Sequence, residues 1–392
     1  SSLGMVGTAD YYLRKNAQFR VTASTSFDIK DHSLVVGFEY EQRTDREYAL
    51  DATGLWERMR QFQNLPNQDL DLSNPLLVMQ DGRLVPYDQV QPGDVFQDTI
   101  VYNYAYAADN SSAFAENVRM ALGMDRYSTE QINIDNLDPS TFSIDMFSPD
   151  ELINPNGSKY VGYYGYDYKG EISKEKSSIS DFFLEKDANG RFVRAVGAFQ
   201  PIYIAGYIQD QFTFRDLTFN VGVRIDRFDL NQQVLKDPYI LYPFYSVEDL
   251  SNSPLQGQDL NIPGSIGGDY SVYVNTYDYN SPNLSIVGYR DGDTWYDAEG
   301  NQANSGADIY NANEQVFPQY TVDDDQRDIK RLGFDTDLSF EDYKPQINVM
   351  PRLAFSFPIS DEANFFAHYD ILVQRPPSNT FVDPSVYYYW ER

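Results

Sequence analysis

The stretch LTFNVGVRIDRFD, residues 217–229, alternates apolar and polar side chains with a period of two. Successive side chains of an extended strand point to opposite faces, so this pattern predicts a β-strand with one apolar face. That face carries Leu217, Phe219, Val221, Val223 and Ile225. A protein core, a second sheet and lipid would all accept such a face, so the fold depends on which of them it contacts.

Similar alternation occurs in three pairs of runs, and only a few polar residues join the two runs of each pair. The pairs span residues 13–48, 200–229 and 346–373, with turns at 30–32, 215–216 and 360–362. Alternating runs joined by short polar turns predict antiparallel β-hairpins. The runs hold roughly 10 to 14 residues, whereas a tilted strand needs about 9 to 11 to cross a bilayer.

Long segments separate the hairpins, namely residues 49–199 and 230–345, and residues 374–392 follow the third hairpin. In an up-and-down sheet this alternation puts the tight turns at one edge and the long segments at the other. Outer-membrane barrels show that asymmetry, because their periplasmic turns are short and their extracellular loops are long. The sequence therefore predicts an all-β fold, a partial antiparallel transmembrane β-barrel. The alternative is a soluble β-sandwich, in which the apolar faces of two sheets meet across a core.

The long segments are expected to carry structure of their own, because structureless loops beyond about 12 to 15 residues are uncommon in compact domains. Two stretches within them, residues 182–196 and 292–302, are predicted to form small hairpins. Their expected turns are Asn189-Gly190 and Glu299-Gly300, since such pairs favour tight hairpin turns. The predicted extracellular loops are thus structured.

Composition argues against several classes of protein. With 30 basic and 59 acidic residues, the formal charge of -29 repels phosphate backbones and argues against nucleic acid as a partner. The absence of cysteine excludes a disulfide framework. No run approaches the roughly 18 apolar residues that suggest a membrane-spanning helix. The first ten residues, SSLGMVGTAD, lack signal-peptide features, so a mature chain or an internal fragment is expected.

Several motifs resemble a known family. The stretch YIQDQFTFRDLTFNVGVRIDRFD (207–229) resembles a paired-strand segment of TonB-dependent outer-membrane receptors, in which a Tyr-x-Gln-Asp strand, a short turn and an Asn-x-Gly-x-Arg-x-Asp strand follow one another. Three further stretches resemble the Oar-like branch found in Bacteroidota. They are YYGYDYKG (163–170), QVLKDPYILYP (233–243) and PRLAFSFPISDEANFFAHYDILVQRPP (351–377). The resemblance covers the three hairpins well and the loops patchily.

The resemblance implies a receptor in the outer membrane of a Gram-negative bacterium, with extracellular loops that bind a ligand and a polar lumen that imports it. Such receptors have a 22-strand barrel, an N-terminal plug, a TonB box and often a preceding carboxypeptidase-regulatory-like domain. None of those N-terminal parts is recognisable in this sequence, so the resemblance implies a middle portion of the barrel. The implied partners are outer-membrane lipid, TonB with its inner-membrane energising complex, and a surface lipoprotein or another outer-membrane protein. The sandwich alternative implies a non-enzymatic surface adhesin or interaction module.

A tyrosine-rich stretch, YVGYYGYDYKG (160–170), is the candidate ligand-binding site. Aromatic side chains bury much area at a small cost in conformational freedom, so they suit sugars, peptides and partner proteins. The candidate residues are Tyr160, Tyr163, Tyr164, Tyr166 and Tyr168. The alternative is a tyrosine-rich hairpin that packs against a neighbouring loop.

Acidic loops raise the question of a divalent cation such as calcium, and no other cofactor is expected. Asp323, Asp324, Asp325 and Asp328 concentrate carboxylates that repel one another unless a cation bridges them. A solvated acidic loop is the alternative. The stretch DGDTWYDAEG (291–300) fails the calcium-binding EF-hand pattern, so a hairpin is predicted there. With only His32 and His368 and no cysteine, the sequence predicts no enzyme.

Two structural predictions follow from the barrel hypothesis. Charged side chains avoid lipid, so Arg20, Arg224 and Arg352 are expected to point into the lumen. The opposite, lipid-facing side should carry Phe19, Val21, Leu34, Val36, Phe219, Val221, Val223, Leu353 and Phe355. Six visible strands are also fewer than the eight of the smallest barrels. The chain is therefore expected to leave the sheet open, and its two edge strands should pair with strands outside residues 1–392.

Overall fold

The computed structural model describes most of the chain as two compact units. The described residues are 10–95, 98–154, 159–173, 176–256, 260–276, 278, 281–313, 315–322, 327–330, 333–375 and 381–389. The first unit comprises Ser1–Asn231 and Pro345–Phe381, and the second comprises Gln232–Lys344 and Val382–Arg392. No helix within the described ranges is long and apolar enough to span a membrane.

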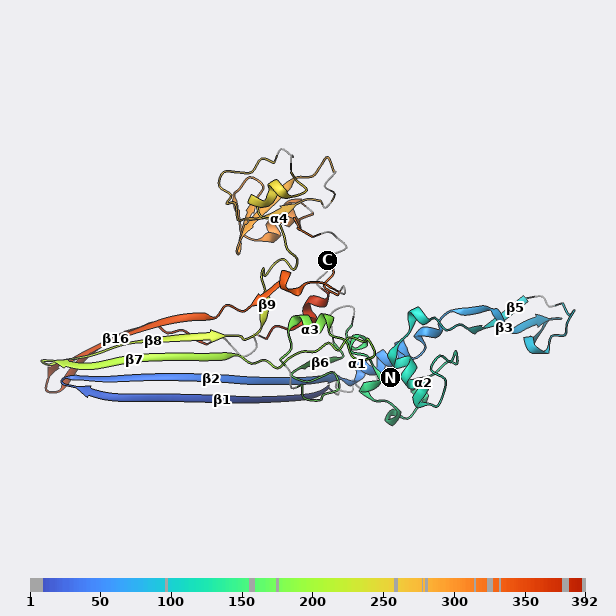
Figure 1. Ribbon diagram of the computed structural model, residues 1–392, viewed down its shortest axis with the longest axis horizontal. Helices are drawn as coiled ribbons and strands as arrows, with labels where there is room; N and C mark the ends of the chain where they lie inside the picture. The colour runs from blue at the N-terminus through green and yellow to red at the C-terminus, as the bar shows by residue number, and fades with distance from the viewer. Residues whose placement is uncertain are drawn as a thin grey trace. The chain divides into compact units, whose positions relative to one another are not determined.

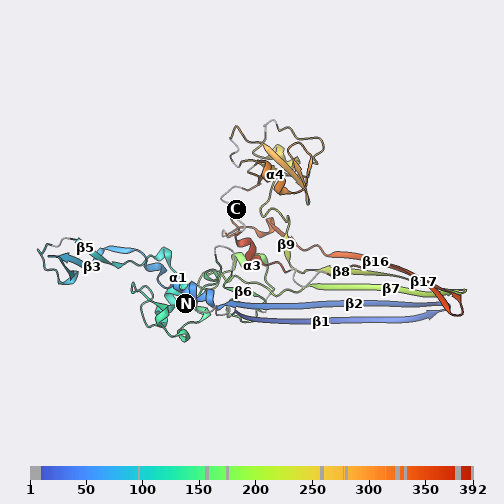
Figure 2. The same cartoon turned by 180° about the vertical axis from the view of Figure 1, so that it is seen from behind.

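A curled antiparallel sheet with six principal strands, shaped as a half-barrel, forms the framework of the first unit (Figures 1 and 2). Its strands in spatial order are β1 (Asp10–Ile29), β2 (His32–Asp51), β7 (Ile202–Phe214), β8 (Leu217–Asp229), β16 (Gln346–Ser360) and β17 (Ala363–Asp370). Strands β1–β2, β7–β8 and β16–β17 pair as hairpins, which confirms the three predicted hairpins. Their tight turns lie together at one end of the sheet.

The sheet is open. Among the described residues, β1 pairs with β2 alone and β17 with β16 alone, so the six strands do not close on themselves. This confirms the expectation that the chain does not form a closed barrel. The pairing of both edges with strands outside this sequence stays a prediction.

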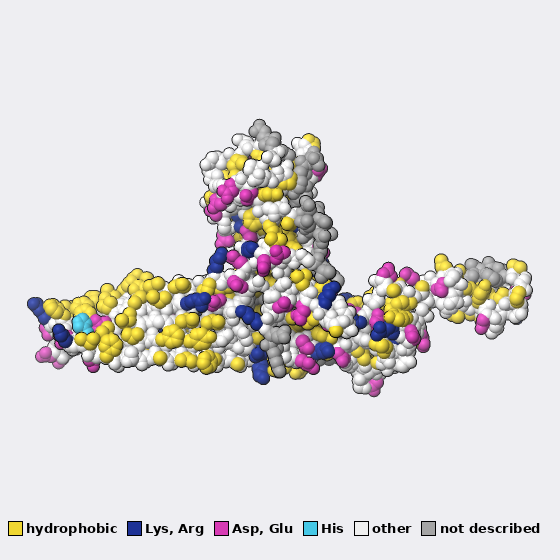
Figure 3. Space-filling view, in the orientation of Figure 1, with side chains coloured by type: hydrophobic (Ala, Val, Ile, Leu, Met, Phe, Trp, Pro, Cys, Tyr) yellow, Lys and Arg dark blue, Asp and Glu magenta, His cyan; other side chains and the backbone are white. Residues whose placement is uncertain are grey.

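The cross-strand register gives the sheet two chemically different faces. The nine predicted apolar side chains share one face, and Arg20, Arg224 and Arg352 share the opposite face, as expected from the alternation. Phe19 is 61% exposed and Ile347, on the same apolar face, is 66% exposed. Hydrophobic side chains cover much of the long strands in Figure 3, whereas charged side chains gather at the turn end and toward the loops.

The long segment after β2 folds around its own hydrophobic core. Its elements are α1 (Ala52–Phe62), β3 (Leu70–Gln80), β4 (Arg83–Pro86), β5 (Asp98–Tyr104), α2 (Ala113–Ala121), β6 (Val161–Tyr164) and α3 (Ile179–Leu184). Side chains cap the helices: Asp51 accepts a hydrogen bond from the Gly54 N–H at 2.8 Å, and Ser112 accepts one from Ala115. Strand β6 pairs with the end of β2, which ties this core to the sheet.

One predicted hairpin in this segment is only partly correct. Its expected turn is present, because Lys186 and Phe192 form a β-bridge around Asn189 and Gly190. Residues 182–184, however, belong to the end of α3. Ser178 and Asp181 form a capping box that starts this helix, and the buried rings of Phe182 and Phe183 hold it in place. Helix capping and burial thus override the hairpin pattern there.

The second unit contains a five-stranded sheet and a separate two-stranded sheet. The larger sheet has the order β13 (Gln302–Ala303), β12 (Thr294–Asp297), β11 (Ile286–Asp291), β10 (Ser271–Val274) and β14 (Phe317–Pro318). The smaller pairs β9 (Gln233–Leu235) with β15 (Phe340–Asp342), and α4 spans Gly306–Asn313. The pairings β11–β12 and β12–β13 confirm the predicted hairpin at 292–302. Val272, Val274 and Tyr289 anchor the core of this unit.

Candidate functional site

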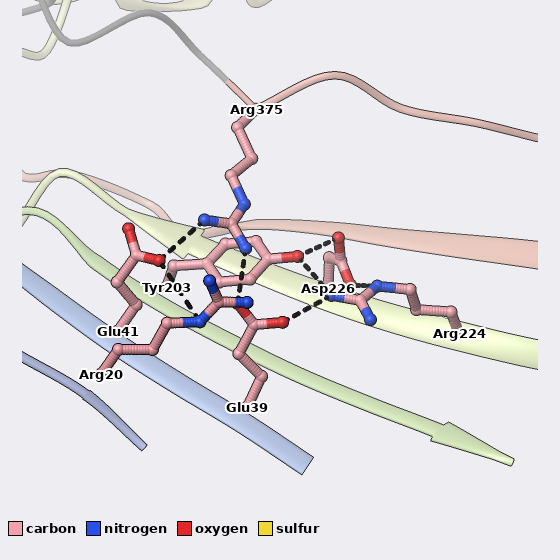
Figure 4. A network of polar contacts seen from close by, with 7 residues as sticks. All are labelled: Arg20, Glu39, Glu41, Tyr203, Arg224, Asp226 and Arg375. Atoms are coloured by element: carbon pink, nitrogen blue, oxygen red, sulfur yellow. Dashed lines mark hydrogen bonds and ion pairs between the residues drawn. The ribbon is translucent and has the colours of Figure 1, made fainter. Parts of the chain in front are cut away.

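A network of charged and polar side chains lies on the face of the curled sheet opposite the apolar face (Figure 4). Its members are Arg20 on β1, Glu39 and Glu41 on β2, Tyr203 on β7, Arg224 and Asp226 on β8, and Arg375, which follows β17. Period-two alternation predicts the orientation of Arg20 and Arg224, and it puts Asp226, two residues after Arg224, on the same face. We call this network the concave polar cluster.

The strand register explains why these side chains meet. Residues 39 and 41 are two apart on β2, so both carboxylates point to the same face. Glu39 is opposite Ala205, which is opposite Asp226, so the three form one row across β2, β7 and β8. The small side chain of Ala205 leaves space above β7, and Arg224 reaches Glu39 across that strand.

Ion pairs and hydrogen bonds connect the members of the cluster that lie on the sheet. Arg20 Nη2 lies 2.7 Å from Glu39 Oε1, and Arg224 Nη2 lies 3.2 Å from Glu39 Oε2. Arg224 also contacts Asp226 at 2.7 Å and donates a hydrogen bond to the Tyr203 hydroxyl at 2.9 Å. That hydroxyl in turn donates to Asp226.

Arg375 completes the cluster from a segment distant in sequence. Its Nη2 lies 2.8 Å from Glu39 Oε1 and its Nη1 lies 3.0 Å from Glu41 Oε2, so one guanidinium bridges both carboxylates. The same group lies over the ring of Tyr203, with 3.5 Å between Arg375 Cζ and the ring centroid. Figure 4 shows the guanidinium between the two glutamates and above the phenol ring.

Burial makes the charge balance of the cluster important. Glu39 and Glu41 are each only 7% exposed, and a buried carboxylate is costly unless cations and hydrogen bonds compensate for its lost hydration. Three guanidinium groups face three carboxylates in the cluster. Removal of one cation would therefore leave an uncompensated negative charge on the face.

A cavity of about 360 Å³ adjoins the cluster on the same face. Gly222 lines the cavity and contributes no side chain, and Arg224 is shared between the cavity and the cluster. Arg352, paired with Asp370 at 3.0 Å, adds charge to the wall, and Ile371 adds apolar surface. The cavity therefore offers both charged and apolar contacts.

The structure places the predicted tyrosine site inside a packed region. Tyr166 is 2% exposed, and Tyr160, Tyr163 and Tyr168 pack against the same hydrophobic core as α1 and α2. Burial raises the pKa of the Tyr168 hydroxyl. These four positions match the packing alternative, and ligand contact through them stays a prediction.

Tyr164 has a different environment from the other four tyrosines. Its ring stacks on Phe381 with 4.6 Å between centroids, and its hydroxyl donates to Glu47 at 3.2 Å. Burial, together with the negative charge of Glu47, raises the pKa of this hydroxyl. Tyr164 thus remains a protonated hydrogen-bond donor at neutral pH.

The structure describes only part of the predicted cation site. Asp323, Asp324 and Asp325 lie outside the described residues, and Asp328 accepts a hydrogen bond from the Lys330 N–H at 2.8 Å. Across the described parts of the chain, no group of three or more His, Cys, Asp or Glu side chains is arranged to hold a metal ion. A divalent cation at residues 323–328 stays a prediction.

Three acidic turns instead share a structural use for their first aspartate. Asp167, Asp187 and Asp297 each begin a turn with glycine three residues later, and each carboxylate accepts the N–H four residues on. The glycine in each turn has a positive φ, which a residue without Cβ adopts readily. These carboxylates stabilise hairpin turns, which explains why an acidic sequence need not be a cation site.

Sequence reasoning missed four members of the concave polar cluster: Glu39, Glu41, Tyr203 and Arg375. Glu39 and Glu41 alternate with Phe38 and Tyr40, so period-two alternation alone could have placed both carboxylates on the polar face. Arg375 follows the last strand and gives no periodic signal.

Comparison with known proteins adds no assignment: no protein-family model, curated protein or solved structure matches the chain. Two features of the fold carry functional information. One is the exposed apolar face of the curled sheet, and the other is the buried charge on the opposite face. Both belong to the first unit.

Proposed function

We propose that this chain forms part of an outer-membrane TonB-dependent receptor, which binds an extracellular ligand with its loops and imports it through a polar lumen. The observation that carries the proposal is the distribution of side chains on the six-stranded sheet. Large apolar residues on one face are exposed, among them Phe19 at 61% and Val349 at 56%, whereas Glu39 and Asp226 on the other face are buried.

This arrangement is the reverse of that in a soluble protein, in which apolar faces are buried and charges are exposed. Lipid would cover the apolar face and make its exposure favourable. A charge there would cost about 2 to 4 kcal/mol at the bilayer midplane. Ion-paired arginines and carboxylates suit the lumen, where water and ligand are polar.

The alternative function, a surface adhesin or interaction module built on a β-sandwich, requires a second sheet. Sandwiched sheets pack about 10 Å apart and bury the side chains between them. In the described chain, Phe19, Ile347 and Val349 are all more than half exposed. The side-chain distribution therefore favours the receptor.

The proposed function implies specific partners. The three tight turns would face the periplasm, where TonB and its inner-membrane energising complex supply energy to receptors of this type. The structured segments at the opposite end of the sheet would face the exterior and bind the ligand, alone or with a surface lipoprotein or another outer-membrane protein. No enzymatic activity is proposed.

Membrane fractionation of the native protein tests the proposal. We expect the protein in the outer-membrane fraction, extractable only with detergent. Its recovery from the aqueous phase without detergent would refute the receptor. A matched pair of variants adds a second test: Val221→Arg places a charge on the apolar face and should impair assembly, whereas Asn220→Arg, one residue away on the polar face, should assemble.

A further inference from the structure

We propose that Glu39, Glu41 and Tyr203 form a binding site for a guanidinium group, which Arg375 occupies in the state described. The ligand class is a peptide or small molecule that carries an arginine-like side chain. Binding requires only the concave face of the sheet. The role of that ligand as imported cargo rests on the proposed function above.

The contacts of Arg375 are those expected of a guanidinium ligand in a binding site. Two carboxylates accept from two different nitrogens at 2.8 and 3.0 Å, and Arg375 Cζ lies over the Tyr203 ring, 3.5 Å from its centroid. Carboxylate pairing and cation–π contact both favour a planar, delocalised cation. The ammonium of lysine is a compact point charge and fits this pair of contacts less well.

The segment that leads to Arg375 is largely exposed. Leu372 is 79% exposed and Val373 is 44% exposed, and residues 371–375 form no helix or strand. The backbone N–H of Ile371, the residue after β17, donates a hydrogen bond to the carbonyl oxygen of Pro351 on β16. Arg375 lies between the end of β17 and Phe381, whose ring stacks on Tyr164, and its side chain can leave the site without breaking a strand pairing.

Charge balance gives a reason for exchange with an external cation. Without Arg375, the buried carboxylates of Glu39, Glu41 and Asp226 would face only Arg20 and Arg224. An uncompensated buried carboxylate is costly, so the emptied site should take up another cation of matching shape. Tyr203, 5% exposed, supplies the ring that selects a planar group.

Calorimetric titration of the detergent-solubilised protein with N-acetyl-L-arginine amide tests this inference. A tethered side chain competes at an effective concentration in the millimolar range, so the probe should bind the native protein weakly. We expect Arg375→Ala to bind it at least tenfold more tightly. The double variant Arg375→Ala/Glu41→Gln should lose that gain.

Arg352→Ala is the matched control. Arg352 lies on the same face and pairs with Asp370, but it does not bridge two carboxylates over a ring, so its removal should create no site for the probe. N-acetyl-L-lysine amide should bind Arg375→Ala several-fold more weakly than the arginine probe. Equal affinities for the two probes would overturn a guanidinium site.

Further outcomes would also overturn the inference. One is an Arg375→Ala variant that binds no more tightly than the native protein, and another is a double variant that binds as tightly as Arg375→Ala. If Arg375→Ala does not fold, Arg375→Lys keeps the charge but loses the fork, and it should still bind the probe more tightly than the native protein. If the protein fractionates with the outer membrane but does not bind the probe, the guanidinium site is refuted and the proposed function stands. The failure of the site is thus distinguishable from the failure of the proposed function.

Discussion

The phenol ring of Tyr207 on β7 covers Gly37, its cross-strand partner on β2. A Cβ atom at position 37 would collide with the ring, whereas a Cβ at Gly206, the next residue along β7, would have its nearest neighbour at 4.0 Å. Aromatic cover of a strand glycine pins the register and permits local curvature of the sheet. The Gly37–Tyr207 pair is therefore expected to help fix the register between β2 and β7, on which the concave polar cluster depends.

Replacement of Gly37 by alanine should destabilise the protein by about 1 to 3 kcal/mol, because the added methyl group displaces the Tyr207 ring. Gly206→Ala is the control, because it makes the same glycine-to-alanine replacement next to Tyr207 at a position where the methyl group has space. The free energy of unfolding in detergent measures both effects. Equal stability of the two variants would show that the ring does not require the glycine.

A second prediction concerns Arg119 on α2, which is fully buried. Its guanidinium donates to backbone carbonyls of Gln63, Ala115 and Ser128 among others, and burial lowers its pKa. Arg119→Ala should cost more than about 3 kcal/mol, because several buried carbonyls lose their donor at about 1 to 3 kcal/mol each. Arg60→Ala removes an exposed ion pair with Asp135 and should change stability little.

Chemical denaturation measures the stability of the two variants, and hydrogen exchange of the amides around α1 and α2 distinguishes them. Arg119→Ala should raise exchange of the amides in both helices, and Arg60→Ala should leave it close to that of the native protein. Comparable exchange in the two variants would mean that Arg119 does not organise this core.

A third prediction concerns pH and the second unit. Burial raises the pKa of the Tyr273 hydroxyl to about 12, although Arg290, which donates to it at 2.9 Å, acts in the opposite direction. In the unfolded chain this hydroxyl has its ordinary pKa of about 10. Between these values the unfolded chain binds fewer protons than the folded protein, so the free energy of unfolding falls as pH rises.

The contribution of Tyr273 is therefore complete below about pH 10 and is lost toward pH 12, by about 1.4 kcal/mol per pH unit. Tyr273→Phe lacks the hydroxyl, so the difference in stability between native protein and variant should shrink over that range. Fluorescence of Trp295, whose ring lies 5.0 Å from that of Tyr273, reports unfolding once Trp56 and Trp390 are replaced by phenylalanine. A difference independent of pH would contradict the assignment.

Period-two alternation was sufficient to predict the framework of the first unit. The hairpins, their turns and the faces of Val221 and Arg224 all follow from it, because strand geometry fixes which side chains share a face. Strand ends were less predictable. β1 begins at Asp10 and β2 ends at Asp51, three residues beyond the predicted span of 13–48 at each end, and their backbone pairing continues to Asp10 and Asp51.

The candidate sites were harder to predict, because they depend on contacts between distant parts of the chain. Tyr166 looks like a binding residue in sequence, but it is buried under α1 and α2, whose positions no local pattern specifies. Arg375 lies more than three hundred residues from its partner Glu39. Nothing in the sequence between them predicts that contact.

In the proposed receptor, lipid covers the apolar face of the curled sheet. The chain has no cysteine, so a cysteine introduced at one position carries a nitroxide label without competition. Labels at successive positions from 218 to 223 would be compared in liposomes for collisions with oxygen, which partitions into lipid, and with a water-soluble nickel chelate. Labels at 219, 221 and 223 should collide mainly with oxygen, and those at 218, 220 and 222 should not. Labels at 219, 221 and 223 that favour the nickel chelate, or that are shielded from both reagents, would contradict the claim.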